Sequence, residues 1–246
     1  MFNETMENGT LKRVKDRSAS GFTVVELLVV TATIAVLVSI LMPSLSRARV
    51  AAMRLRCAHN LKQIYIATDL YLNANDETYP CAQDPLSSEP FYWLWMGRGW
   101  RRFVEPYLGG SIDVNNPSVL FCPQDKSKNY ESTSYAYSMS FYHSSEQINA
   151  ASDKSDTYSK PVPSIPRRRS EVARPSGKIL IGEWLSNHQG TEVKDPGWWG
   201  WVGSRNFLLA DGQVCFLKAR EIRAARDGYP DANLTIDGIK GRDLGP

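Results

Sequence analysis

The sequence predicts an α+β fold, in which one long N-terminal helix packs on a small antiparallel β-sheet. Residues 22–42 are apolar apart from one charged residue, and residues 44–75 continue without Gly or Pro, as a long helix requires. Later segments are short, apolar or alternating and are separated by turn residues, as strands are. We therefore expect an apolar helix at residues 22–43, an amphipathic helix at 44–75 and a globular head with an irregular tail at 76–246.

Composition and charge limit the classes of protein to which the chain can belong. The 246 residues are 42% hydrophobic and 22% charged, which is ordinary for one sizeable domain with an appendage and unlike a disordered or polytopic membrane chain. The formal net charge of +3 is close to neutral, so nucleic acid is not expected as a partner.

The apolar run at residues 22–42 is long enough to cross a membrane. As a helix it would extend about 31 Å, the thickness of the hydrocarbon core of a bilayer. A secretory signal peptide would also follow basic residues and could end near Ser44 and Ser46, but its apolar core is shorter. A simple signal anchor fits the length and leaves Glu26 unexplained, because an unpaired carboxylate in a span costs a few kcal/mol.

The residues at the start of this run resemble a known signature. The segment GFTVVE at residues 21–26, after a basic leader, is similar to the N-terminal motif of type IV prepilins and of type II secretion pseudopilins. The resemblance implies that residues 1–21 are a leader peptide, that residues 22–43 form a membrane and assembly helix, and that a prepilin peptidase cuts after Gly21 and N-methylates Phe22. It also implies that Glu26 of one subunit neutralises the new α-ammonium of a neighbour, and that Pro43 kinks the helix.

The same resemblance predicts location and partners. Basic residues flank the apolar run on both sides, so charge alone leaves its orientation open. A pilin-like chain has its N-terminus in the cytoplasm, spans the inner membrane once and has its head in the periplasm or outside the cell. Its expected partners are the prepilin peptidase, an inner-membrane assembly platform and other pilin-like subunits in a fibre.

The second half of the helix is predicted to be amphipathic. Its apolar residues recur at a spacing of three or four and form one stripe, which in a pilin-like protein packs into the core of the head. The stripe consists of Leu61, Tyr65, Thr68 and Leu72, with Ile64 and Tyr71 beside it.

The head is expected to contain a small sheet. Strands are predicted at residues 134–140, 178–184, 206–210 and 213–217. The last two are expected to form a hairpin with a two-residue turn, Asp211-Gly212, because that dipeptide between apolar runs is a strong hairpin signal.

Segments of the head also resemble pilin-like proteins that are abundant in planctomycete, verrucomicrobial and lentisphaeral bacteria. They are RCAHNLKQI at residues 56–64, FCPQD at 121–125, RPSGKIL at 174–180 and FLLADGQV at 207–214. The last segment is close to the terminal H-x9-DG signature of that group, but Trp201 stands where those proteins have His. The resemblance thus implies the general family and not its His-bearing subset.

No catalytic site can be assembled from the sequence. The three His stand in unrelated contexts, and zinc-protease, nucleophile-elbow and phosphate-loop motifs are absent, so we expect no enzyme and no cofactor. The four Cys are scattered singly, which argues against zinc. One disulfide is plausible in an oxidising compartment, with Cys81 and Cys122 in predicted loops as the first choice. Other pairings stay open, and Cys57 and Cys215 are also explained as buried apolar residues.

Calcium is the one metal ion considered for the tail. Asp227, Asp231 and Asp237 lie near glycines and offer carboxylate oxygens, and some pseudopilins hold calcium in a C-terminal loop. The spacing matches no EF-hand, however, and acidic residues in an exposed tail are more often simply solvated.

Six of the seven tryptophans lie in two clusters, at residues 91–100 and 198–201. Such clusters usually cover a small core, although they also form platforms that bind sugars or proteins. The favoured function is a structural, pilin-like subunit of a type II secretion pseudopilus or a type IV pilus-like fibre. The alternative is a membrane-tethered exported module that binds carbohydrate or a partner through its tryptophans.

Overall fold

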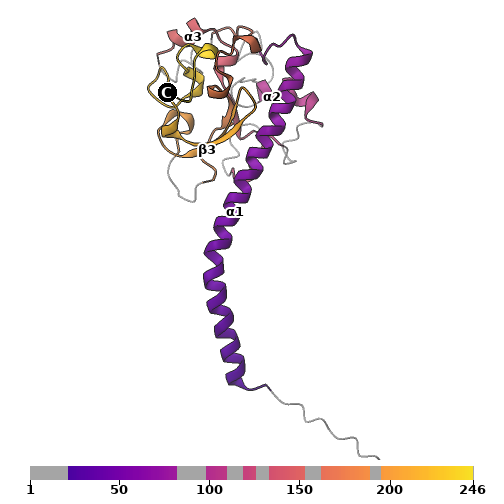
Figure 1. Ribbon diagram of the computed structural model, residues 1–246, viewed down its shortest axis with the longest axis vertical. Helices are drawn as coiled ribbons and strands as arrows, with labels where there is room; N and C mark the ends of the chain where they lie inside the picture. The colour runs from indigo at the N-terminus through magenta and orange to yellow at the C-terminus, as the bar shows by residue number, and fades with distance from the viewer. Residues whose placement is uncertain are drawn as a thin grey trace, which may run out of the picture. The chain divides into compact units, whose positions relative to one another are not determined.

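The computed structural model describes residues 22–81, 98–109, 119–125, 133–152, 162–188 and 195–245. The chain divides into two compact units, one ending at Ser46 and the other beginning at Arg47. Its described part combines one long helix, a small antiparallel sheet and several short helices (Figure 1). The predicted α+β class is therefore confirmed.

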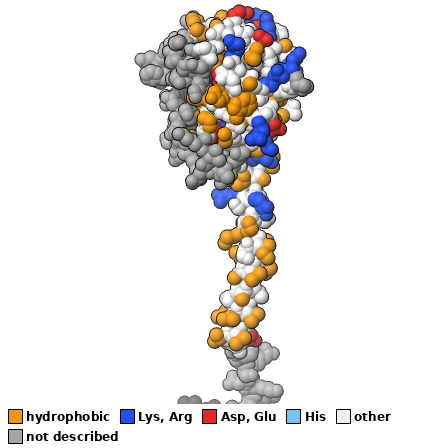
Figure 2. Space-filling view, turned by 90° about the vertical axis from the view of Figure 1, so that its left-hand side faces the viewer, with side chains coloured by type: hydrophobic (Ala, Val, Ile, Leu, Met, Phe, Trp, Pro, Cys, Tyr) orange, Lys and Arg blue, Asp and Glu red, His pale blue; other side chains and the backbone are white. Residues whose placement is uncertain are grey.

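Helix α1 (Val24–Ala74) is 51 residues long and contains Pro43, through which the helix continues. Every side chain from residue 22 to residue 46 is exposed in the single chain. Apolar side chains line this half of the helix (Figure 2). The helix is long and apolar enough to cross a membrane, because a bilayer core requires about 20 such residues.

The second half of α1 buries one face, as the sequence predicts. The residues of this face recur at a spacing of three or four, which places them on one side of a helix. They are Cys57, Asn60, Leu61, Ile64, Ala67, Thr68 and Leu72. Tyr65 and Tyr71 are partly buried beside them and pack against the core. The helix ends before Asp76 and Glu77, whose positive φ angles of 50° and 57° interrupt the right-handed spiral.

Four antiparallel strands form one sheet in the order β1-β2-β3-β4. Their bounds are β1 (Tyr135–Tyr137), β2 (Ile179–Glu183), β3 (Ser204–Leu209) and β4 (Val214–Lys218). All four overlap predicted strand segments, although β3 begins two residues earlier than expected. The first is shorter than expected, because the chain turns into the 3-10 helix η2 (Met139–Phe141).

The hairpin between β3 and β4 has a three-residue loop, so the predicted two-residue turn is wrong. The Leu209 N–H donates to the Gln213 carbonyl at 2.8 Å, and the Gly212 N–H donates to the Leu209 carbonyl at 2.9 Å. Gly212 has a φ of +87°, the left-handed conformation that adds one residue after a tight turn. The Asp211 carboxylate accepts from the Gln213 N–H and stabilises this loop.

One face of the sheet packs against the second half of α1. The pairing register places Tyr135 beside Glu183, and Asn206 beside Phe216. The Asn206 side-chain amide donates to the Arg54 carbonyl at 3.3 Å, and the Arg54 guanidinium lies 4.6 Å from the centre of the Phe216 ring. The side chains on this face are therefore directed at the helix.

The opposite face of the sheet is covered by tryptophan. Trp198, in the 3-10 helix η6 (Gly197–Trp199), packs against Phe207 of β3 with 5.9 Å between ring centres. A Cβ atom at Gly182 would lie 2.3 Å from the Phe207 ring, so this close packing requires glycine. Both central strands are fully buried as a result.

The remaining helices are short. They are α2 (Arg98–Val104), η1 (Glu105–Tyr107), α3 (Ser145–Ala150), η4 (Arg169–Glu171) and η5 (Pro175–Gly177). A capping box between Ser144 and Gln147 begins α3, since each side chain bonds the backbone N–H of the other residue.

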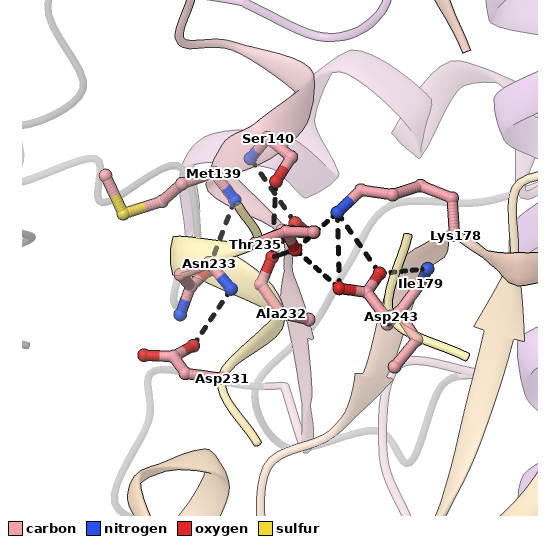
Figure 3. Close-up of polar contacts among 10 residues, drawn as sticks. Met139, Ser140, Lys178, Ile179, Asp231, Ala232, Asn233, Thr235 and Asp243 are labelled. Atoms are coloured by element: carbon pink, nitrogen blue, oxygen red, sulfur yellow. Dashed lines mark hydrogen bonds and ion pairs between the residues drawn. The ribbon is translucent and has the colours of Figure 1, made fainter. Parts of the chain in front are cut away.

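The C-terminal tail is irregular, as expected, but much of it is buried. It contains only the 3-10 helices η7 (Ala219–Glu221), η8 (Ala232–Leu234) and η9 (Gly238–Lys240). The Asp243 carboxylate lies 3.1 Å from Lys178 Nζ and accepts from the Ile179 N–H at 2.7 Å, which fastens the tail to the start of β2 (Figure 3). The expectation that the tail carboxylates are solvated is wrong for Asp231, which is 1% exposed, and Asp243 is also buried, at 3%.

Candidate functional site

Four side chains of the metal-ligand type meet in the interior: Cys57, Cys122, Glu183 and His188. All four are buried, and their ligand atoms lie within 4.8 Å of one another. The two sulfur atoms are 2.7 Å apart, and Cys122 Sγ is 3.5 Å from His188 Nε2. That nitrogen lies 2.7 Å from Glu183 Oε1. We call this group the Cys-Glu-His cluster; among the residues described, no other group of this kind is found.

The two cysteines are brought together by contacts between α1 and the loop at residues 119–125. Cys57 lies on the buried face of α1. Three residues further along, the Asn60 side-chain amide donates to the Phe121 carbonyl at 3.0 Å. The Cys122 N–H donates to the Ser134 hydroxyl at 3.0 Å, just before β1. The loop is thereby held between the helix and the sheet, with Cys122 against Cys57.

Glu183 and His188 come from the end of β2 and the segment that follows it. The Asn206 N–H donates to Glu183 Oε2 at 2.7 Å, which leaves Oε1 directed at His188. His188 Nδ1 lies 3.0 Å from the Gln124 side-chain oxygen. Because that oxygen only accepts, Nδ1 is assigned a proton, and Nε2 faces Glu183 and Cys122.

Burial and close contact set the protonation states in the cluster. Burial on its own lowers the pKa of His188, but hydrogen bonds with Cys122 and Glu183 outweigh it and raise this pKa to about 9. The hydrogen bond with Cys57, followed by burial, raises the pKa of the Cys122 thiol. At neutral pH His188 is therefore protonated, and the Cys122 thiol is not ionised.

The cysteine pair differs from the first choice made from the sequence. Cys122 lies beside Cys57 and not beside Cys81, which is near Tyr71 and Arg167 instead. Burial raises the pKa of the Cys81 thiol to about 11. Cys122 lies beside Cys57 because the loop at residues 119–125 docks on the face of α1 that carries Cys57.

Two sequence signals could have pointed to the cluster. The first signal is that segments with the pilin-like resemblance lie together. Residues 56–64 contact residues 121–125 through Cys57 and Asn60, and they contact residues 207–214 through Lys62. The second signal is Glu183 itself, a carboxylate inside an apolar strand, which needs a buried partner. His188 carries no such signal, since only the fold brings it to Glu183.

The residues predicted for processing and assembly lie at the start of α1. Gly21 lies outside the described residues, and Phe22 is 75% exposed. The N–H and hydroxyl of Thr23 donate to Glu26 Oε2 at 2.8 and 2.7 Å, and the Glu26 N–H donates back to the hydroxyl at 3.2 Å. This is a capping box, which the Thr-x-x-Glu spacing could have indicated. Glu26 therefore has a local structural role in addition to any role between subunits.

The three aspartates considered for calcium each have a local partner. Asp227 accepts from the Tyr229 N–H, Asp231 accepts from the Asn233 N–H and Asp237 accepts from the Asn149 side chain. Burial, followed by repulsion from Asp227, raises the pKa of Asp231 to about 7. These contacts place the carboxylates in turns and caps of the tail.

The tryptophans occupy different environments. Trp100 and Trp198 are among the most buried side chains, and Trp184 packs against both Trp198 and Trp199. Trp201, which stands at the signature His position, is 41% exposed. Trp93 and Trp95 lie outside the described residues. The described tryptophans thus mainly contribute to the core.

Comparisons with known proteins identify no relative: no protein-family model, no curated protein and no solved structure matches the chain.

Proposed function

We propose that the chain is a structural, pilin-like subunit of a type II secretion pseudopilus or type IV pilus-like fibre. The observation that carries the proposal is the first half of α1, which is apolar on all sides and wholly exposed in the single chain. A helix that is apolar all round is stable only when lipid or other protein surrounds it. Lipid would cover it before assembly, and the same half-helix of neighbouring subunits would cover it in a fibre.

The proposal includes processing at the start of this helix. A prepilin peptidase would cut between Gly21 and Phe22 and methylate the new amine. The cut leaves an α-ammonium in an apolar environment, where an unpaired charge is costly, and Glu26 of another subunit would neutralise it. Both Thr23 hydrogen bonds use Oε2 of Glu26, so Oε1 has no hydrogen bond within the described residues and is available to such a partner.

The proposed role is mechanical and not enzymatic. The head would lie in the periplasm or outside the cell, with the leader in the cytoplasm. Partners would be the peptidase, the inner-membrane assembly platform and other pilin-like subunits. The buried position of the Cys-Glu-His cluster supports this role, since a closed site offers no access to a substrate.

Mass spectrometry of the mature chain tests the processing step. In cells with an active prepilin peptidase, the chain should lack residues 1–21 and should begin with N-methylated Phe22. The same chain from cells without the peptidase provides the control and should retain the leader. An uncut chain in the presence of active peptidase would refute the proposal.

Three variants separate the two roles of Glu26. Glu26→Gln removes the charge but preserves the capping box, because glutamine also serves at this position. Thr23→Ala removes the side-chain cap, at a cost of about 1 kcal/mol, and preserves the charge. Glu26→Val removes both.

If pairing between subunits is the important role, Glu26→Gln and Glu26→Val should insert into the membrane normally and fail to enter fibres, while Thr23→Ala should assemble. Membrane fractionation and fibre shearing measure the two steps. Normal assembly of Glu26→Gln together with failure of Thr23→Ala would show that the residue acts only as a helix cap.

A further inference from the structure

We propose that Cys57, Cys122, Glu183 and His188 bind one Zn²⁺ ion, which fastens helix α1 to the head. The inference does not depend on the pilin-like role, because it rests only on residues of the unit that begins at Arg47.

The types of ligand favour zinc. Thiolates and imidazole are soft or borderline ligands that select Zn²⁺ over Ca²⁺ and Mg²⁺, and a carboxylate is a common fourth ligand. Four protein ligands with no access for water are typical of structural zinc sites. Two thiolates and one carboxylate would leave the loaded site with a net charge of −1, less than the −2 of a site made of four cysteines.

The geometry requires only small adjustments. Tetrahedral zinc, with bonds of about 2.0–2.3 Å, places its ligand atoms about 3.3–3.8 Å apart. The separations in the structure are 2.7 Å between the sulfurs, 3.5 Å from Cys122 Sγ to His188 Nε2 and 2.7 Å from that nitrogen to Glu183 Oε1. Each of these three pairs reaches the required separation by a change of about 1 Å or less, within the range of side-chain rotation.

The surrounding residues already orient the ligands. Zinc-binding histidines usually donate their second ring N–H to a neighbouring oxygen, and His188 Nδ1 lies 3.0 Å from the Gln124 side-chain oxygen. Glu183 likewise receives the Asn206 N–H on Oε2, which leaves one oxygen for the ion. Gln124 and Asn206 therefore hold the two ligands so that Nε2 of His188 and Oε1 of Glu183 point to the centre of the cluster.

A disulfide between Cys57 and Cys122 is the competing interpretation. It would form one S–S bond with loss of two protons and two electrons to an external oxidant. It would use neither Glu183 nor His188, whose side chains would remain buried beside the bond without taking part in it. Zinc accounts for all four side chains and for the two residues that orient them.

Metal analysis of the whole chain tests the proposal. The full-length protein is purified in detergent, under reducing conditions and without chelator, and its metal content is measured. We expect one Zn²⁺ per chain. After removal of the metal, titration with Co²⁺ should produce the visible absorption of a tetrahedral site and a thiolate charge-transfer band, and added Zn²⁺ should abolish both.

Variants assign the site to these residues. Cys57→Ser/Cys122→Ser should lose the thiolate band, whereas the matched control Cys81→Ser/Cys215→Ser should keep it. If the first pair fails to fold, Gln124→Leu provides a milder test, because loss of a residue that orients a ligand weakens metal affinity about 10–100-fold without changing the stoichiometry.

Two results would overturn the inference. One is a reduced wild-type chain that binds neither Zn²⁺ nor Co²⁺. The other is native protein that contains no metal and a Cys57–Cys122 disulfide, as detected by peptide mapping without reduction. Neither result bears on cleavage after Gly21, so the zinc site and the pilin-like role can fail independently.

Discussion

Lys178 and Asp243 form an ion pair that is almost closed to water, with side-chain exposures of 0% and 4%. The ammonium nitrogen lies 3.1 Å from Oδ2, so the attraction is about 5 kcal/mol at an effective dielectric constant near 20. Lys178 also donates to the Thr235 hydroxyl, and Asp243 accepts from the Ile179 N–H (Figure 3). Burial lowers the pKa of Lys178, and the attraction to Asp243 opposes that shift. Removal of either charge alone should therefore leave the other buried without compensation.

We expect Lys178→Met to reduce the free energy of unfolding by about 3–5 kcal/mol, which is the usual effect of breaking a buried pair. This corresponds to about 150- to 5000-fold in the folding equilibrium constant. In the double variant Lys178→Met/Asp243→Asn no charge remains, and the amide oxygen can still accept from the Ile179 N–H. Its stability should return to within about 1–2 kcal/mol of the wild type.

Urea unfolding of the full chain in detergent measures these values, with fluorescence of the buried Trp184 and Trp198 as the signal. Lys240→Met, at an exposed lysine, is the control and should change stability by less than about 0.5 kcal/mol. A cost below 1 kcal/mol for Lys178→Met would show that the pair is hydrated. Equal losses in the single and double variants would refute the argument from an uncompensated charge.

Three other changes test separate contacts. Gly212→Ala should cost at least about 1–2 kcal/mol, because alanine resists a φ of +87° and its Cβ would lie 2.5 Å from the Tyr65 ring; an unchanged urea midpoint would contradict this. Burial lowers the pKa of His143 to about 4, below the value of 6.5 for an exposed histidine. The neutral His143 ring therefore stabilises the folded state above pH 6.5, and this stabilisation is lost as the pH falls towards 4. His143→Phe should therefore lose less stability than the wild type over this pH range, by roughly 3 kcal/mol at most, and parallel pH profiles would exclude the effect. Arg54→Leu should cost about 0.5–1 kcal/mol through loss of its contact with the Phe216 ring, and thermal unfolding that matches the wild type would show that the contact contributes nothing.

Local patterns in the sequence were sufficient to predict the main elements. Residues 44–75 contain no helix breaker and have a regular apolar spacing, so the end of α1 and its buried face follow from short-range rules. The strands were also located, because apolar runs between turn residues have few alternatives. The length of the β3–β4 loop was missed, because Gly212 adopts a left-handed conformation that the Asp-Gly pair alone does not distinguish from a two-residue turn.

The Cys-Glu-His cluster was not predicted, because its members are far apart in the chain. Cys57, Cys122 and the pair Glu183 and His188 are separated by about 60 residues at each step. No spacing rule relates such positions, and cysteines scattered singly along a sequence do not indicate a metal site. The sequence favours a pair between Cys81 and Cys122 because both lie in predicted loops, but proximity depends on which loop docks on which helix face.

The sequence by itself predicts the N-terminal apolar helix and its likeness to a prepilin segment, because these features involve consecutive residues. It also suggests the candidate roles of Gly21, Phe22 and Glu26. The tertiary structure alone decided which polar groups are buried together: Lys178 with Asp243, and Cys57 with Cys122, Glu183 and His188. The physical reason is the range of the interactions. Helix formation and membrane affinity depend on neighbours within a few turns, whereas buried polar partners are chosen by packing across the whole head.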